Sequence, residues 1–552
     1  MNALWFILLI GVLIFVHEFG HFVVAKACGV KVLRFSLGFG PPILSVQRGE
    51  TEYVVAWLPL GGFVSMLGAD PSEDIPPEDR DRAYFARPLW QRFAIALAGP
   101  AMNLVFPVAI YFAFFYSHAT LPPAAVGAVF AGTPAQAAGM KPGDRIVRIG
   151  DTPIRYWADL QGLVSEAAGR TLEIELDRAG ERIVTQLTPE KQEVVSRMGR
   201  RSTVGRIGIA AHYLGSQVGV LGDRSPAALA GLHSFDRVVA IDGAPVERWF
   251  EVERAFDKAP GRTLRLTVVR DEPVISAAVT VHAGRTLELS VPVPLDGRTK
   301  SAGLYAGEHF ALEVDDGSPI WEAGMRAGDM LVTADQTLCP TWDACMTWMI
   351  RRPDELHVIG FVKGDLPEAG IQYAPLRVKF ETRVGEYREE QKIPVLGARN
   401  RTIVVSPKPI ANESRLSYAA VNSVTKNLEV VAVTAYGFVM IVRGDISTKS
   451  LGGPIMIYNI AGKAAEKGWE EYLWVMALIS INLGLINLLP VPMLDGGHLL
   501  FVLIEAVKRG PISLRSRAIA TYVGLSFLIF LMLFAFKNDI ERYWEDITSL
   551  FR

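Results

Sequence analysis

The hydrophobic positions of this chain gather in two long regions, one at each end, with a polar region between them. Residues 1–116 and about 417–536 are strongly apolar, whereas 119–415 mix polar and apolar positions as water-soluble domains do. An apolar helix of about 20 residues can cross a bilayer. The stretches long enough to do so are 1–28, 93–116, 472–507 and 518–536. The pattern predicts a multi-pass α-helical membrane domain in two halves, 1–118 and 472–536, with a large aqueous insert.

Two local features refine this picture. Pro490 and Pro492 interrupt the third stretch, so we expect its helix to be broken there. A further apolar run, 430–442, is too short to span a bilayer by itself. Apolar residues recur at helical spacing just before it, so 417–443 is expected to form an amphipathic helix lying on the membrane surface. The expected number of spans is therefore four.

Basic residues set the expected orientation, because loops rich in Lys and Arg stay in the cytoplasm. The first stretch lacks a basic leader and is split by ionisable residues, so it is interpreted as a retained span rather than a cleaved signal peptide. Both termini and the insert are then expected outside the cytoplasm. The residues behind this prediction lie between spans one and two (Arg48, Arg80, Arg82, Arg87, Arg92) and between spans three and four (Lys508, Arg509, Arg515, Arg517).

The net charge and the cysteine content of the chain add little to the predicted fold and function. The chain has 552 residues and a formal net charge of −2, so nothing suggests a nucleic-acid partner. Of the three cysteines, Cys28 is expected to be a buried thiol at the end of the first span. Cys339 and Cys345 could form a local disulfide, but not if both lie on one helix. The sequence leaves these two alternatives open.

The insert contains a signature that occurs three times, with starts 92 and 93 residues apart. In each copy a Gly follows a Pro by five residues, an Asp follows it by ten, and a β-type run comes next. A period of this length indicates whole small domains. The second copy has Phe235 where the others have Gly143 and Gly328, and this change is expected to alter its turn. The signature residues are Pro134, Gly139 and Asp144, then Pro226, Gly231 and Asp236, then Pro319, Gly324 and Asp329.

This order of strand, short helix, Gly-Asp turn and strand resembles the PDZ domain, an α+β fold. The resemblance covers 124–190, 204–285 and 303–406. It implies units that bind extended chain ends by adding a strand to a sheet edge. The alternative is that the copies only fill space, since a fold does not by itself imply peptide binding.

The first span contains the sequence His17-Glu18-Phe19-Gly20-His21, an HExxH motif. On a helix the two imidazoles lie four residues apart on one face, so both can ligate one metal ion. Glu18 is then placed to act as general base on a metal-activated water. Ionisable groups are costly inside a bilayer, so their presence here needs a functional reason. The plainer alternative is a polar helix end that faces a cavity.

A third ligand is expected from another span, and Asp495 is the best-placed acidic residue. It follows Asn487, Pro490 and Pro492 in a stretch that the prolines should unwind, which is tolerated at membrane depth where backbone lines a cavity. Asn482 and Asn487 would offer amides near a substrate. His498 is the competing ligand, although a hydrogen-bonding or structural role is favoured for it. A helix cap is the alternative for Asp495.

HExxH in a first span together with NxxPxPxxDG in a later span resembles the double signature of the site-2 proteases, which are intramembrane zinc metalloproteases. The resemblance implies one zinc ion on His17, His21 and Asp495, with Glu18 activating the water. It further implies substrate contacts from Asn487 and Asn482. The PDZ-like insertion is similar to that of the bacterial regulator of sigma-E protease subgroup. Members of that subgroup usually carry two such domains, whereas this chain carries three copies.

The resemblance also implies a β-hairpin near 43–46 and 51–58 that re-enters the membrane, the alternative being an ordinary cytoplasmic hairpin. Gly61 and Gly62 beside an exposed strand edge would then suit pairing with a substrate strand. An inner-membrane location is implied, surrounded by lipid, with periplasmic PDZ domains and the HExxH motif in the cytoplasmic half of the membrane.

The implied substrates are single-span proteins already shortened on the outer side, such as an anti-sigma factor, and remnant signal peptides. The PDZ tandem would act as a size filter. Two other functions remain open: an anchored metalloprotease acting on soluble extracytoplasmic peptides, and a non-enzymatic PDZ scaffold.

Overall fold

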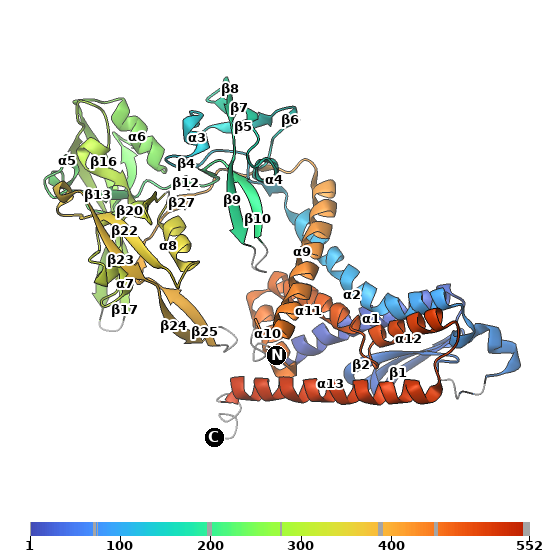
Figure 1. Ribbon diagram of the computed structural model, residues 1–552. Helices are drawn as coiled ribbons and strands as arrows, with labels where there is room; N and C mark the ends of the chain where they lie inside the picture. Colours follow the sequence, from blue (N-terminus) through green and yellow to red (C-terminus); the bar gives the residue numbers. More distant parts are fainter. Residues whose placement is uncertain are drawn as a thin grey trace. The chain divides into compact units, whose positions relative to one another are not determined.

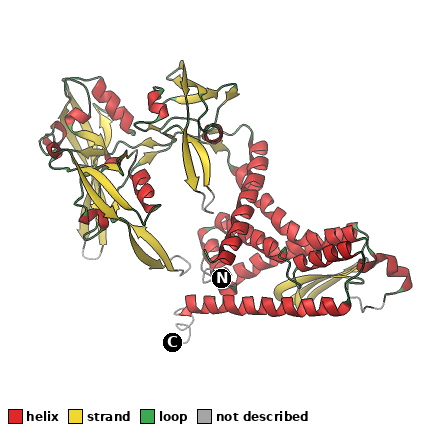
Figure 2. Cartoon of the chain, in the orientation of Figure 1, coloured by secondary structure: helices red, strands yellow, loops and turns green. Residues whose placement is uncertain are grey.

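The computed structural model describes residues 2–69, 73, 75–195, 201–276, 279–339, 341–384, 390–445 and 451–544. These residues form two compact units (Figure 1). The helical unit comprises mainly Met1–Ala119 and Asn412–Arg552, and the repeat unit comprises Thr120–Arg383 and Gln391–Ala411. Helices dominate the first unit and strands the second (Figure 2).

Among the described residues, five helices of the helical unit are long and apolar enough to cross a membrane, one more than expected. They are α1 (Asn2–Ala27), α2 (Leu89–Ser117), α9 (Arg415–Arg443), α11 (Trp469–Asn487) and α13 (Leu514–Arg542). The predicted break in the third span is present, because seven residues separate the end of α11 at Asn487 from the start of α12 (Asp495–Lys508). A shorter helix, α10 (Pro454–Lys467), precedes α11.

Helix α9 confirms the helix predicted at 417–443, and its place on the membrane surface stays a prediction. The apolar run 430–442 is short, but the helix that contains it has 29 residues and is itself a candidate span. It packs antiparallel against α2. The Arg415 guanidinium donates to the carbonyl of Tyr116, and the Asn427 amide donates to the carbonyl of Leu104. Twelve residues separate these two contacts on each helix, so the two helices lie side by side over three turns.

Contacts at the helix ends fix how the remaining helices run relative to one another. Helix α10 begins where α13 ends, because the backbone N–H of Gly453 donates to the Asp539 carboxylate. Helix α11 begins beside the start of α1, where the rings of Trp469 and Trp5 lie 5.1 Å apart. The start of α11 therefore lies at the end of the unit where α1 begins.

Strands β1 (Val32–Arg48) and β2 (Thr51–Met66) fold into more than the simple hairpin expected. Phe35 pairs with both Tyr53 and Val64, so the first part of β1 lies between the two ends of β2. The last part of β1 pairs with the start of β2 on the other side. The resulting order of antiparallel segments is 62–66, 32–37, 51–56 and 42–48, and segment 62–66 is an edge of the sheet.

The turn of this sheet is fixed to the end of α1. Glu50 accepts hydrogen bonds from Arg82 and Lys26, and these cations lower the pKa of its carboxyl. At the opposite end of the sheet, large apolar side chains are exposed, among them Phe39, Ile43, Leu44, Trp57 and Leu58. An exposed apolar surface of this kind is suited to lipid.

The repeat unit contains three four-stranded sheets with the same strand order: β6-β5-β7-β8, β15-β14-β16-β17 and β21-β20-β22-β23. A helix lies between the second and third strands of each in the sequence: α4 (Trp157–Glu166), α6 (Trp249–Asp257) and α8 (Trp342–Ile350). The sheet strands are β5 (Arg145–Ile149), β6 (Thr152–Pro153), β7 (Leu172–Arg178), β8 (Glu181–Leu187), β14 (Arg237–Ile241), β15 (Ala244–Pro245), β16 (Thr263–Ser276), β17 (Val279–Pro292), β20 (Met330–Ala334), β21 (Thr337–Leu338), β22 (Leu356–Val362) and β23 (Ile371–Arg377).

A further pair of short strands closes each copy by joining its start to its end. The pairs are β4 (Ala128–Val129) with β11 (Ile209–Ala210), β13 (Val218–Val220) with β18 (Leu304–Ala306), and β19 (Glu313–Val314) with β26 (Ala398–Arg399). The closing strands therefore bracket 128–210, 218–306 and 313–399, which overlap the three ranges expected from the sequence.

The repeated Asp of the signature forms a buried ion pair in every copy. Asp144, Asp236 and Asp329 are at most 3% exposed. Each pairs with a cation 34 residues later, which is Arg178, Arg270 or Lys363. The same cation also donates to the carbonyl of the signature Gly, at Gly139, Gly231 or Gly324. The signature thus corresponds to one buried ion-pair arrangement that occurs in all three copies.

The prediction that Phe235 alters its turn is wrong. Its φ is +74°, close to the +97° of Gly143 and the +85° of Gly328. A left-handed backbone costs about 1–2 kcal/mol for a residue with a Cβ atom. The Phe235 ring packs against Leu221, Phe310 and Val362, a small core between the second and third copies, and this burial offsets the cost.

The cysteine alternatives are resolved by the local structure. Cys339 follows β21, whereas Cys345 lies on α8, so the two are not on one helix. They form a disulfide, which is part of the core of the third copy. Cys28 is a free thiol.

Candidate metal centre

Helices α1 and α2 cross in close contact because glycines face the partner helix. A Cβ atom on Gly20 would lie 2.4 Å from the carbonyl oxygen of Ala98. A Cβ atom on Gly99 would lie 2.3 Å from Nε2 of His21. Real Cβ atoms do not approach other atoms so closely, so both positions require glycine. The HExxH face of α1 is therefore held directly against α2.

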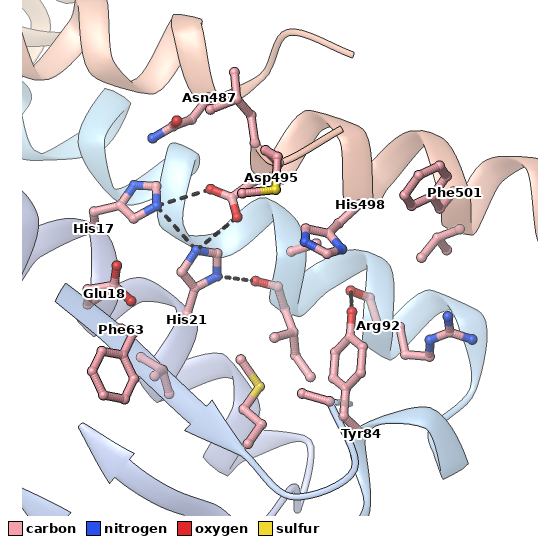
Figure 3. Close-up of a pocket in the computed structure, with 18 of the residues that line it drawn as sticks. His17, Glu18, His21, Phe63, Tyr84, Arg92, Asn487, Asp495, His498 and Phe501 are labelled. Carbon is pink, nitrogen blue, oxygen red and sulfur yellow. Dashed lines mark hydrogen bonds and ion pairs between the residues drawn. The ribbon is translucent and has the colours of Figure 1, made fainter. Parts of the chain in front are cut away.

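Two further glycines shape the start of α12. Cβ atoms on Gly496 and Gly497 would lie 2.1 Å and 2.5 Å from the carbonyl oxygens of Leu489 and Val491. The segment between α11 and α12 therefore folds back tightly against the first turn of α12. This fold places Asp495, the first residue of α12, opposite the histidines of α1 (Figure 3).

His17, His21 and Asp495 meet in one cluster. Nε2 of His17 lies 3.0 Å from Oδ2 of Asp495, and Nε2 of His21 lies 3.3 Å from Oδ1. The two Nε2 atoms are themselves 3.3 Å apart. Both histidines are buried. Among the described residues, this is the single group of three or more potential metal ligands whose donor atoms converge.

The cluster fits a tetrahedral metal ion. Zinc binds nitrogen and oxygen at about 2.0–2.1 Å, so neighbouring ligand atoms of a tetrahedral site lie about 3.3–3.4 Å apart. The three separations in the cluster are 3.0, 3.3 and 3.3 Å. Three lone-pair donors at this distance repel one another unless a metal ion or a proton lies among them. Two imidazoles and one carboxylate are a zinc donor set that leaves a fourth position open.

Groups outside the cluster fix the histidine rings. Nδ1 of His21 donates to the carbonyl of Ile95 at 2.7 Å, which leaves Nε2 as the free donor atom. The side-chain amide of Asn103 lies 3.1 Å from Nδ1 of His17 and is fully buried. As placed, the amide nitrogen Nδ2 faces Nδ1, while the amide oxygen is buried without a hydrogen-bond partner in the described part of the chain. Turned by 180°, the amide accepts from Nδ1 and frees Nε2 in the same way. No role for Asn103 was predicted from the sequence, although a polar residue within the apolar second span is a signal of function.

A cavity of about 450 Å³ opens at the cluster. Glu18, Gly62 and Asn487 line it together with the three potential ligands. Asn482 and Gly61, which the sequence also suggested, are not among the residues that line it. Gly61 instead lies against the ring of Phe39.

His498, the competing ligand, lies outside the cluster of donor atoms. It lines the same cavity, one turn after Asp495 on α12 (Figure 3). Its ring contacts that of Phe501 edge-on, with the ring centres 6.5 Å apart. The geometry therefore selects Asp495 over His498 as the third potential ligand.

Comparisons with known proteins agree with this geometry. The model of the family "Peptidase family M50" matches residues 5–531. Regulator of sigma-E protease RseP of Escherichia coli is 28% identical over 557 residues, which cover 98% of this chain and 100% of that protein. Protease RseP of Yersinia pestis is 29% identical over 552 residues, which cover 98% of this chain and 100% of that protein. A relative from Neisseria meningitidis, which carries a zinc metalloprotease name, is 30% identical over 98% of this chain and 99% of its own length.

The family match covers nearly the whole chain, including both segments that supply the cluster. The relatives match over the same extent. The chain therefore belongs to peptidase family M50, and it is a multi-pass membrane zinc metalloprotease.

Proposed function

We propose that this metalloprotease cleaves peptide bonds within membrane-spanning segments of other proteins. The observation that carries the proposal is the position of the ligand cluster. His17 and His21 lie inside α1, a 26-residue apolar helix, ten and six residues before its last residue, Ala27. A protease acting on soluble peptides would gain nothing from placing its ligands there, because ionisable groups at membrane depth are costly.

In this proposal His17, His21 and Asp495 hold one zinc ion, and Glu18 is the general base. Zinc, when bound, supplies Lewis acidity toward the attacking water and the scissile carbonyl. Glu18 accepts the proton of the water and returns it to the leaving amine. Asn487, which lines the cavity, binds the substrate backbone through its amide.

The sheet edge 62–66 offers a way to unwind a helical substrate. A helix hides its carbonyls in internal hydrogen bonds, whereas an added strand exposes them next to its partner. Gly62 lies beside Glu18, since a Cβ atom on Gly62 would be 3.1 Å from Cγ of Glu18. The absence of a side chain there leaves room for a substrate strand next to the general base.

We infer that the repeat unit lies in the periplasm and that the HExxH motif lies in the cytoplasmic half of the inner membrane. The basic loops after α1 and α12 support this orientation. The Cys339–Cys345 disulfide supports it independently, because disulfides persist in oxidising compartments. The free thiol Cys28 lies at the opposite, cytoplasmic end of α1.

The relatives named RseP regulate sigma-E, as their name says. By analogy we propose that the substrates here include a single-span anti-sigma factor already shortened on its outer side, and remnant signal peptides. The three copies of the repeat unit, interpreted as PDZ domains, would exclude substrates that still carry a bulky outer domain.

The deciding experiment uses the purified protein in detergent with a truncated single-span substrate. Wild type should cleave it, and Glu18→Gln should not, while both contain one zinc ion per chain by metal analysis. Retention of zinc shows that the variant lacks only the base. Cleavage by Glu18→Gln at the wild-type rate, or no cleavage by zinc-loaded wild type, would reject the proposal.

A further inference from the structure

The cavity that holds the metal cluster also reaches a buried group of charged side chains. Arg92 of α2 and Arg517 of α13 line this part of the cavity. Glu505 of α12 lies between them. Its Oε2 is 2.9 Å from Nη2 of Arg92, and its Oε1 is 2.8 Å from Nη2 of Arg517. Arg92 is 7% exposed and Glu505 is 4% exposed, whereas the side chain of Arg517 is 19% exposed.

The group carries one positive charge in excess, because two guanidinium groups share one carboxylate. The Nε atoms of both arginines are buried and have no hydrogen-bond partner within the described part of the chain. The ring of Phe85 lies 4.9 Å from the guanidinium carbon of Arg92 and 5.0 Å from that of Arg517. An aromatic face eases the burial of a cation but does not neutralise it. An uncompensated charge in a largely buried place is unfavourable, and a bound anion would neutralise it.

The remaining ionisable groups that line the cavity do not compensate this charge. The acidic residues among them are Glu18 and Asp495, and both belong to the metal end. Asp495 and Glu505 are ten residues apart on α12, which corresponds to about 15 Å along a helix. The other ionisable residues lining the cavity are His17, His21, His498 and Tyr84.

The sheet edge 62–66 connects the two ends of the cavity. Gly62 lies beside Glu18, as described above. At the other end, the backbone N–H of Tyr84 donates to the carbonyl of Leu67, and the Tyr84 hydroxyl donates to the carbonyl of Arg92. A strand that pairs with this edge therefore passes from the metal cluster to the arginines. About 15 Å corresponds to four or five residues of extended chain at about 3.3 Å each.

We propose that Arg92 and Arg517 form a subsite for an aspartate or glutamate side chain of the substrate. This side chain lies about four or five residues from the scissile bond, on the side that leads toward the start of α2. The inference rests on the proposed function, because it needs a substrate strand in the cavity. A carboxylate is favoured over a lipid phosphate, since the arginines line the substrate cavity and are buried among α2, α12 and α13.

A purely structural role would be to hold α2, α12 and α13 together. One arginine would satisfy Glu505 for that purpose, so the second guanidinium is left unexplained. The two roles differ in what they predict. A structural connection affects thermal stability, whereas a subsite affects the choice between substrates that differ by one charge.

The experiment uses the zinc-loaded full-length protein in detergent and a series of single-span substrates. Each substrate carries one Asp at two to seven residues from the cleaved bond, and each has an Asn counterpart. The expected kcat/KM ratio of Asp to Asn substrate peaks four or five residues away, at about tenfold or more, as for a hydrogen bond to a charged group. Arg92→Gln and Arg517→Gln should bring this ratio close to one. Arg515→Gln, an exposed position on α13, should keep it.

Each outcome bears on one claim. Failure of wild type to cleave any member of the series rejects the proposed function. Cleavage with an Asp to Asn ratio near one at every position rejects the subsite alone. A ratio that disappears when phosphatidylglycerol is added assigns the arginines to lipid phosphate and also overturns the subsite. If Arg92→Gln does not fold, the wild-type series and Arg517→Gln decide the question.

Discussion

The buried amide of Asn103 lies 3.1 Å from Nδ1 of His17, although the two residues come from different helices. This contact holds the ring of a metal ligand in the orientation that points Nε2 at the cluster. We expect Asn103→Ala to lower zinc affinity about 10- to 100-fold, the usual cost of losing such a partner. Competition with a chelator, followed by metal analysis, measures the change.

Two further variants test whether orientation is the cause. Asn103→Asp keeps an oxygen acceptor for Nδ1 and should retain more zinc than Asn103→Ala. Asn459→Ala removes an amide that bonds only within α10 and should leave zinc affinity unchanged. Equal zinc affinity in Asn103→Ala and wild type would contradict the role assigned to Asn103.

Gly99 is expected to tolerate no side chain. An alanine methyl group would lie 2.3 Å from Nε2 of His21, so the ring must move away from the cluster. Displacements of about 1 Å in catalytic groups cost on the order of 100-fold in rate. Gly99→Ala should therefore lose at least this much activity. Gly11→Ala on α1, where no atom lies within 4 Å of the new Cβ, is the matched control and should retain wild-type turnover.

The disulfide provides a test of orientation as well as stability. In intact cells with an oxidising periplasm, a maleimide reagent should label only Cys28 unless the protein is first reduced. The loop closed by Cys339 and Cys345 is short, so its loss should destabilise the third copy by about 2 kcal/mol. Faster limited proteolysis of the third copy in the Cys339→Ser, Cys345→Ser double variant measures this effect. Labelling of all three cysteines without reductant would argue against a periplasmic repeat unit.

The repeat unit can be removed with little disturbance to the helical unit. The backbone N–H of Asn412 donates to the carbonyl of Ala119 at 2.9 Å. The chain therefore leaves the helical unit and returns to it at neighbouring points. Replacing 122–409 with a short Gly/Ser linker should therefore preserve the helical unit. If the repeat unit is a size filter, this variant cleaves a full-length substrate that wild type rejects. Unchanged selectivity of an active deletion variant would exclude the filter.

Much of the site was predictable because the sequence itself marks it. Ionisable residues in apolar stretches are rare, so His17, His21 and Asp495 stood out without any structure, and the spacing of the histidines fixed them on one face. The prolines before Asp495 likewise predicted the break between α11 and α12, which the structure confirms. The threefold signature predicted three similar units, and each contains a sheet of the same strand order.

Other features depend on contacts that no local pattern encodes. The helix predicted at 417–443 is present as α9, but its packing along α2 could not be derived from its own sequence. Phe235 keeps a glycine-like turn because a neighbouring copy buries its ring. Asn103, the Arg92–Glu505–Arg517 group and the four-segment sheet required residues distant in the sequence to be placed together. The sequence alone determined that the ionisable residues of the apolar helices cannot face lipid, because a charge in hydrocarbon is costly. Only the tertiary packing decided which other residues they contact.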